Sequence, residues 1–143
     1  MPDRTMQGVF PIVSMPFDEQ GRIDFDDLRV EVEWAISHGV HGLGVAVASE
    51  IFKLSESERD KVTKAVVGQA NGRAKIVINT GEQGTDLAIH YSQKAQDLGA
   101  DALMIRPPSF IPVPDYEVAE YFRRIAEAVD IPIFMQDQGN GMV

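Results

Sequence analysis

The sequence predicts an α/β fold in which short parallel strands alternate with amphipathic helices. Short runs rich in β-branched residues alternate with longer stretches whose apolar residues recur at helical spacing. Glycines follow the predicted helices, and each next strand begins within a few residues. Residues 35–43 are also similar to residues 95–103, at an offset of 60 positions. That offset equals two strand–helix units of about 30 residues each.

Five strands are predicted from the apolar runs at 8–14, 42–47, 75–80, 102–106 and 131–136. These runs are nearly continuous rather than alternating, which is typical of parallel strands whose two faces are both covered. The short connections and the strict alternation with helices also favour parallel strands joined by helical crossovers.

Four helices are predicted between the strands, at 24–38, 55–70, 85–98 and 115–129. The second opens on Ser55 and Glu58, the spacing of a capping box in which two side chains satisfy free backbone N–H groups. Asp115 is predicted to cap the fourth helix. Gly39 and Gly99 follow helices where a left-handed residue is favoured.

The composition excludes several classes of protein. The chain has 143 residues, no cysteine and a formal net charge of −9, from 13 Lys+Arg against 22 Asp+Glu. This charge disfavours nucleic acid and anionic membranes as partners. No apolar run approaches the roughly 20 residues of a membrane span. The N-terminus lacks the basic and apolar regions of a signal peptide, so we expect a cytoplasmic protein.

Two architectures fit five strands and four helices. One is an open, doubly wound five-stranded parallel sheet, and the other is the first part of a (β/α)8 barrel, which needs roughly 250 residues. Neither a G-x-G-x-x-G motif nor a P-loop occurs, which disfavours dinucleotide and nucleotide binding. The sequence stops in a loop after the fifth strand, with no helix to cover it, so we expect a fragment of a longer domain.

Several segments together carry a family resemblance, namely 8–18, 21–24, 38–43, 50–59, 79–81, 95–101 and 131–133. In this order they resemble the dihydrodipicolinate synthase/N-acetylneuraminate lyase family of pyruvate-type class I aldolases. The resemblance covers essentially the whole chain and favours the barrel. It implies that residues 1–143 form an incomplete TIM-barrel domain containing the first five strands, with the remainder absent.

The resemblance also implies a mechanism. In this family a lysine on the sixth strand forms a Schiff base with a 2-keto acid, and the iminium acts as an electron sink. That lysine would lie beyond Val143. A tyrosine after the fourth strand relays protons with a Thr-Thr pair after the second strand, and backbone amides near that pair hold the keto-acid carboxylate. We expect neither a cofactor nor a metal.

The sequence departs from this family pattern at the expected site. The segment 46–50 stands where the family has G-T-T-G-E, so both threonine hydroxyls are missing, although the amides of Ala48 and Ser49 can still bind a carboxylate. Ser109 stands at the position of the relay tyrosine. Gln136 and Asp137 replace a Tyr-Asn pair after the fifth strand.

The barrel geometry indicates the same positions, because catalytic groups collect at the carboxyl ends of barrel strands. Arg106 follows a strand and can clamp a carboxylate through its planar fork, or instead pair with Glu82 or Asp137. Gln136 and Asp137 can bind the hydroxyls of a sugar acid, or satisfy loop backbone.

We therefore expect a lyase that acts on a small 2-keto acid or keto-deoxy sugar acid by Schiff-base chemistry. The alternative is a non-catalytic descendant that binds such a ligand without turnover. The exposed sheet edges of an incomplete barrel predict a homo-oligomer, and the 143-residue chain alone is predicted to be inactive.

Overall fold

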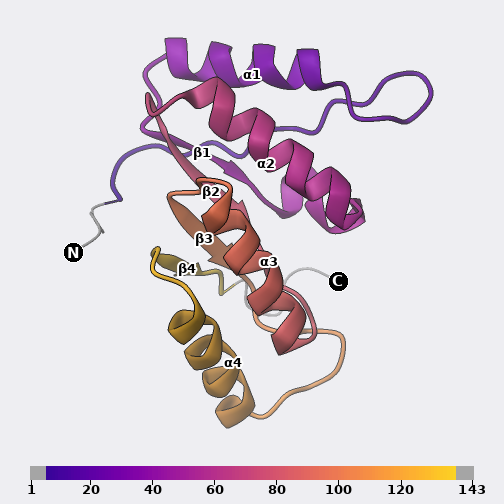
Figure 1. Cartoon of the computed structure of the whole chain (residues 1–143). Coiled ribbons are helices and arrows are strands. Elements are labelled where there is room, and N and C mark those ends of the chain that lie inside the picture. Colours follow the sequence, from indigo (N-terminus) through magenta and orange to yellow (C-terminus); the bar gives the residue numbers. More distant parts are fainter. Residues whose placement is uncertain (1–5, 138–143) are drawn as a thin grey trace.

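The computed structural model describes residues 6–137 and contains four helices that alternate with four strands (Figure 1). The sheet is parallel and its strands lie in chain order, β1-β2-β3-β4. The elements in sequence are α1 (Phe25–Ser37), β1 (Gly42–Val45), α2 (Glu56–Ala70), β2 (Lys75–Asn79), α3 (Thr85–Asp97), β3 (Ala102–Ile105), α4 (Asp115–Ala128) and β4 (Ile133–Met135). Two short 3-10 turns, η1 (Val47–Ser49) and η2 (Ile51–Lys53), follow β1.

The predicted helices are confirmed to within one residue at each end, because their caps are local. The Asp24 carboxylate accepts from the amides of Asp26 and Asp27 at the start of α1. Ser55 and Glu58 form the predicted capping box at the start of α2. The fourth cap was predicted wrongly: Pro114 occupies the N-cap position, and Asp115 is the first helical residue. Its charge still complements the positive end of the helix.

The predicted first strand, 8–14, is wrong as a strand of the sheet. The segment lies extended beside β1, but it forms only one isolated bridge, between Ile12 and Gly44. The Val13 amide donates to the Gly44 carbonyl at 2.9 Å. In a continuous parallel ladder the preceding donor on this segment would be Pro11, two residues earlier, but proline has no N–H group. Proline therefore interrupts the pairing. Gly42 allows the close approach, since a Cβ there would lie 2.1 Å from the Phe10 ring.

The sheet has two different faces, because successive side chains in a strand point to opposite sides. One face meets the helices and forms the core, with fully buried side chains that include Leu43, Ile76, Leu103 and Ile105. The other face carries Gly44, Val77, Met104 and Phe134, which line a cavity of about 270 Å³ together with the N-terminal segment. We call this second face the inner face.

This arrangement is that of consecutive units of a barrel, and it contradicts the open-sheet alternative. A doubly wound sheet reverses its strand order and places helices on both faces. Here the order never reverses, and the helices follow one another along one side of the sheet (Figure 1). The sheet has four strands rather than the five that were predicted, because Pro11 lacks the N–H group that residues 8–14 would need to pair as a strand.

Outside the sheet, one network of polar contacts joins α1 to the end of α2. The Glu33 carboxylate accepts from Arg73 Nη1 and Nη2 at 2.8 and 2.6 Å, and from Gln69 Nε2 at 2.7 Å. The hydrogen bond from Arg73, and then that from Gln69, lowers the pKa of Glu33 from 4.5 to about 2. Both ionic side chains remain nearly half exposed, so the stabilisation is modest.

We predict a specific pH dependence for this network. Because the pKa of Glu33 is lower in the folded chain, its stabilisation is fully present above pH 4.5 and is lost as the pH falls toward 2. Glu33→Gln should therefore lower the free energy of unfolding at neutral pH and lose this effect in acid, as measured by urea denaturation. In an Arg73→Gln background most of the pH-dependent difference should disappear. An equal effect of Glu33→Gln at every pH would contradict the prediction.

Candidate functional site

A cavity of about 390 Å³ opens at the carboxyl ends of β2 and β3. Its walls come from the turns after β1, β2 and β3, which lie next to one another because the strands are parallel and in sequence. The lining residues are Val47, Phe52, Asn79, Gly81, Glu82, Gln83, Arg106, Ser109 and Phe110. This is the end of the sheet at which barrel enzymes place their chemistry.

Arg106 reaches this cavity directly from the end of β3. Its backbone lies so close to Gly81 that a Cβ on Gly81 would come within 3.1 Å of the Arg106 nitrogen. Within residues 6–137, no hydrogen bond or ion pair is recorded for the guanidinium. Of the two alternative partners, Glu82 is instead bound by Arg59, whose Nη2 donates to Glu82 Oε1 at 2.7 Å, and no ion pair joins Arg106 to Asp137 within the described residues. The guanidinium of Arg106 therefore keeps its fork of donors for an anion.

The loop after β2 is fixed from behind by buried groups. Arg59 is 8% exposed, and its guanidinium lies over the Tyr91 ring, 4.5 Å from the centroid. The Tyr121 hydroxyl donates to the Glu82 carbonyl at 3.0 Å and accepts from the Glu82 amide at 3.2 Å. Burial raises the pKa of Tyr121, which keeps this phenol in its neutral, donating form.

Gln83 connects this loop to the segment that follows β3. Its Oε1 accepts from the amides of Ser109 and Phe110, at 2.9 and 3.0 Å. The two loops are thereby tied together across the mouth of the cavity. Ser109 is exposed and lines the cavity, so the structure places this predicted catalytic residue beside Arg106. Its catalytic role stays a prediction.

The turn after β1 places Ala48 and Ser49 differently. Ser49 is fully buried, and its amide donates to the Ala46 carbonyl at 2.9 Å. Its hydroxyl donates to the Val13 carbonyl and accepts from the Ala46 amide. A carboxylate would therefore compete with Ala46 for the Ser49 N–H group. Ala48 is exposed in the same turn, next to Val47, which lines the cavity.

The residues after β4 complete this end of the sheet. The Gln136 amide donates to the Ile105 carbonyl at 2.8 Å, which extends the β3–β4 pairing by one step. This places Gln136 beside Arg106 in the register of the strands. The side-chain Oε1 of Gln136 is buried and has no hydrogen-bond partner among residues 6–137. Asp137 follows and is exposed.

Two cavity residues escaped the sequence analysis. Asn79 is the last residue of β2, and the sequence does not show which face of the sheet its side chain lies on. The role of Gln83 depends on a loop 26 residues away, and no sequence motif signals it. Thr80, in contrast, lies at a strand end but turns toward the helices, where its hydroxyl contacts Ser92 at 2.8 Å.

Residues 6–137 contain no cluster of three or more His, Cys, Asp or Glu side chains placed to hold a metal ion. In the same part of the chain, no helix is long and apolar enough to cross a membrane.

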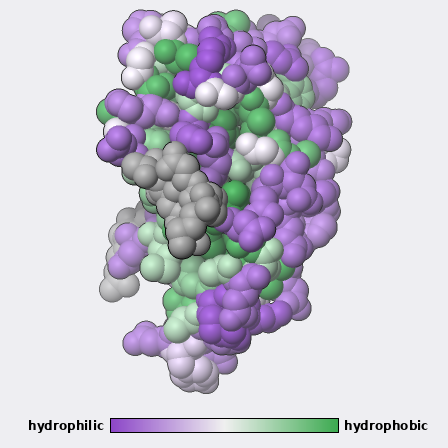
Figure 2. Space-filling model, turned by 60° about the vertical axis from the view of Figure 1, so that its left-hand side comes forward, coloured by the Kyte–Doolittle hydropathy of each residue, from purple (hydrophilic) through white to green (hydrophobic). Residues whose placement is uncertain are grey.

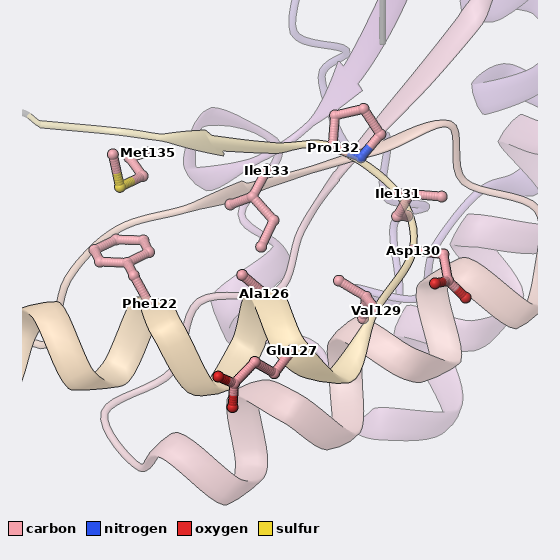
Figure 3. A pocket seen from close by; sticks show the side chains of 9 residues that line it. All are labelled: Phe122, Ala126, Glu127, Val129, Asp130, Ile131, Pro132, Ile133 and Met135. Carbon is pink, nitrogen blue, oxygen red and sulfur yellow. The ribbon is translucent and has the colours of Figure 1, made fainter. Parts of the chain in front are cut away.

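A larger groove, of about 870 Å³, lies elsewhere, between α4 and β4 (Figure 3). Phe122 and Ala126 point from the helix toward Ile133 and Met135 on the strand, whereas the Glu127 carboxylate points away from the groove. Its lining is mostly apolar and offers no group for acid–base or nucleophilic chemistry except the two carboxylates at its margin. The groove therefore marks an uncovered packing surface rather than a catalytic site.

The comparisons with known proteins give the family of this chain. The profile of the dihydrodipicolinate synthetase family matches residues 5–137. The 4-hydroxy-tetrahydrodipicolinate synthase of Methanococcus vannielii is 34% identical over 131 residues, which are 91% of this chain and 45% of that protein. The L-2-keto-3-deoxyarabonate dehydratase of Azospirillum brasilense is 32% identical over 135 residues, 92% of this chain and 44% of that protein. The chain thus spans less than half the length of these curated relatives.

Solved structures confirm the barrel prediction. Dihydrodipicolinate synthase from Acinetobacter baumannii, complexed with pyruvate, is 32% identical and superposes with a TM-score of 0.89 over 92% of this chain and 45% of its own. A protein from Pseudomonas aeruginosa described as a putative dihydrodipicolinate synthetase is 25% identical, with a TM-score of 0.91 over 96% and 49%. The four strands and four helices match the N-terminal part of this TIM barrel. Both sequence and structure show that the chain belongs to the dihydrodipicolinate synthetase family.

Proposed function

We propose that this protein binds a small 2-keto acid, or a keto-deoxy sugar acid, at the carboxyl ends of its strands and acts on it by class I aldolase or dehydratase chemistry. The observation that carries the proposal is the cavity in which an Arg106 guanidinium without an ion pair stands beside Ser109. Family membership supports the reaction class, since the relatives include both a synthase and a keto-deoxy sugar acid dehydratase.

The proposed roles follow the chemistry of each group. Arg106 binds the carboxylate through charge-assisted hydrogen bonds. The exposed Ala48, next to the cavity residue Val47, adds its backbone amide, and the Ser49 amide can take part only if its hydrogen bond to the Ala46 carbonyl is given up. Ser109 supplies a hydroxyl at the position of the family's relay tyrosine. Gln136 and Asp137 accept from the hydroxyls of a longer substrate, because both present oxygen acceptors.

The Schiff-base lysine is proposed to lie outside these 143 residues, in a sixth strand of the same barrel. Three lysines of the described chain are held by carboxylates and do not suit the role. Lys53 pairs with Glu50 at 2.8 Å, and Lys75 pairs with Asp101 at 2.8 Å at the opposite end of the sheet. Hydrogen bonds to Asp60 and Glu56 raise the pKa of Lys94, which keeps this amine protonated and non-nucleophilic.

Borohydride trapping tests this assignment. Pyruvate and borohydride should leave a reduced adduct on one lysine of the natural gene product, located by mass spectrometry. The 143-residue chain alone should give no adduct and no lyase activity, because its cavity contains no amine. An adduct on any lysine within residues 1–143, or none on the whole gene product, would contradict the Schiff-base assignment.

The alternative function is ligand binding without turnover. The missing hydroxyls at Val47 and Ala48, and the short Ser109 in place of a phenol, favour it, because serine is far less acidic than tyrosine. A panel of 2-keto acids and keto-deoxy sugar acids separates the two functions. Turnover of any member supports the lyase, whereas binding without turnover supports the alternative.

Arg106 provides a sharper test that applies to both functions. Arg106→Gln should raise the Kd for pyruvate about tenfold or more, since a hydrogen bond to a charged group contributes about 1.5–3 kcal/mol. Arg124→Gln is the matched control, because Arg124 lies on α4 and pairs with Asp86 outside the cavity. Isothermal titration calorimetry measures both values. Equal affinities for the two variants would exclude Arg106 as the carboxylate clamp.

Association of the chain is the last part of the proposal. Phe134 and Met135, in the last strand of the sheet, are 39% and 68% exposed. On the face drawn in Figure 2, hydrophobic surface gathers in the middle and lower part between hydrophilic margins. Open strand edges and large apolar patches both promote association.

We predict that the 143-residue chain forms dimers or larger species at micromolar concentration, with an interface above about 2,000 Å². Met135→Glu should weaken this association, because Met135 lines the groove in Figure 3. Tyr116→Glu, which changes an exposed residue of α4 outside the groove, should not. Sedimentation velocity gives the oligomeric state. A compact wild-type monomer would overturn the prediction.

A further inference from the structure

Asn79 is a buried polar residue whose side chain is incompletely satisfied. It is only 5% exposed, and its Nδ2 has no hydrogen-bond partner in the structure. Buried amide groups in folded proteins are almost always hydrogen-bonded, so each exception needs a physical explanation. The explanation depends on where this side chain points.

The alternation of β2 places Asn79 on the inner face. Its neighbours Ile78 and Thr80 lie on the helix side, where Ile78 belongs to the core and Thr80 contacts Ser92 of α3. Val77, two residues before Asn79, lies on the inner face. Asn79 is also one of the residues that line the 390 Å³ cavity together with Arg106 and Ser109.

The register fixes its relation to Arg106. Asn79 pairs with Met104 of β3, so Arg106, two residues later and just after the end of β3, stands one layer above Asn79 on the same face. The Asn79 side chain, which ends in an N–H₂ group, therefore lines the cavity one layer below the Arg106 guanidinium. Both groups are donors, and residues 6–137 supply no acceptor that is recorded for either one.

The other unsatisfied donor has a different setting. Arg59 leaves its Nε unpaired, but its guanidinium is stacked on Tyr91 and bonded to Glu82 behind the loop. Arg59 thus already has a structural role that explains its burial. Within residues 6–137, the Asn79 Nδ2 donor has no partner that would explain its burial in the same way.

We propose that Asn79 is a ligand-binding residue that donates from Nδ2 to an oxygen of the bound 2-keto acid. This inference rests on the proposed function and adds a second, neutral donor to the Arg106 clamp. At a buried position such as that of Asn79, a neutral amide donor selects an oxygen acceptor over a methyl group without adding charge. Asn79 is thereby a binding and specificity residue of the site.

The test uses the natural gene product, labelled with ¹⁵N-asparagine and titrated with pyruvate. The Nδ2 resonance of Asn79, assigned by substitution, should shift in proportion to occupancy. Asn79→Ala should raise the Kd for pyruvate about tenfold, and Asn79→Asp should raise it further, because a carboxylate replaces the donor and repels the anion. Gln93→Ala, which removes an exposed amide on α3, is the matched control and should leave the Kd unchanged.

The outcomes separate this inference from the proposed function. If pyruvate binds in an Arg106-dependent manner, while the Asn79 resonance stays fixed and Asn79→Ala binds normally, the inference is overturned and the proposed function stands. If the wild-type protein binds none of the keto acids in the panel, both are overturned. If Asn79→Ala fails to fold, as judged by circular dichroism, the wild-type resonance shift alone decides between a ligand contact and a purely structural role.

Discussion

The two-residue period of a parallel strand, which sends alternate side chains to opposite faces, is the constraint on which the rest of this structure depends. In β2, Ile76 and Ile78 pack against helices, while Val77 and Asn79 face inward. Because all four strands share one direction and follow one another in order, their inward residues form rows across the sheet. The site is the last of these rows at the carboxyl ends.

The loops around that site are held in place by a set of side-chain hydrogen bonds. Arg59 holds the Glu82 carboxylate, Tyr121 holds the Glu82 backbone, and Gln83 holds the two amides that begin the exposed loop at Ser109. These contacts tie α2, α4 and two loops to one rim. Because Arg59 binds the Glu82 carboxylate, that carboxylate does not neutralise Arg106, although both residues line the cavity.

The departures from the family pattern change the chemistry more than the architecture. Backbone geometry around Val47–Ser49 forms a short 3-10 turn even though the threonine hydroxyls are absent, and Ser49 secures that turn through Ala46 and Val13. The cavity thus combines side-chain donors from Asn79 and Arg106 with few groups suited to proton transfer. The function proposed above gives these donors the recognition of an oxygen-rich anion.

The sequence by itself determined the helices, the parallel strands after residue 40 and the family, because caps, spacing and apolar runs are local signals. Ser55 with Glu58 shows this, since both capping partners lie within four residues. Only the tertiary structure showed that residues 8–14 form a single bridge to β1 instead of a strand of the sheet, because Pro11 lacks the required donor. It also decided that Glu82 binds Arg59 rather than Arg106, and that Asn79 faces the cavity. These outcomes depend on contacts between residues far apart in the chain, whose distances and facing directions no local pattern encodes.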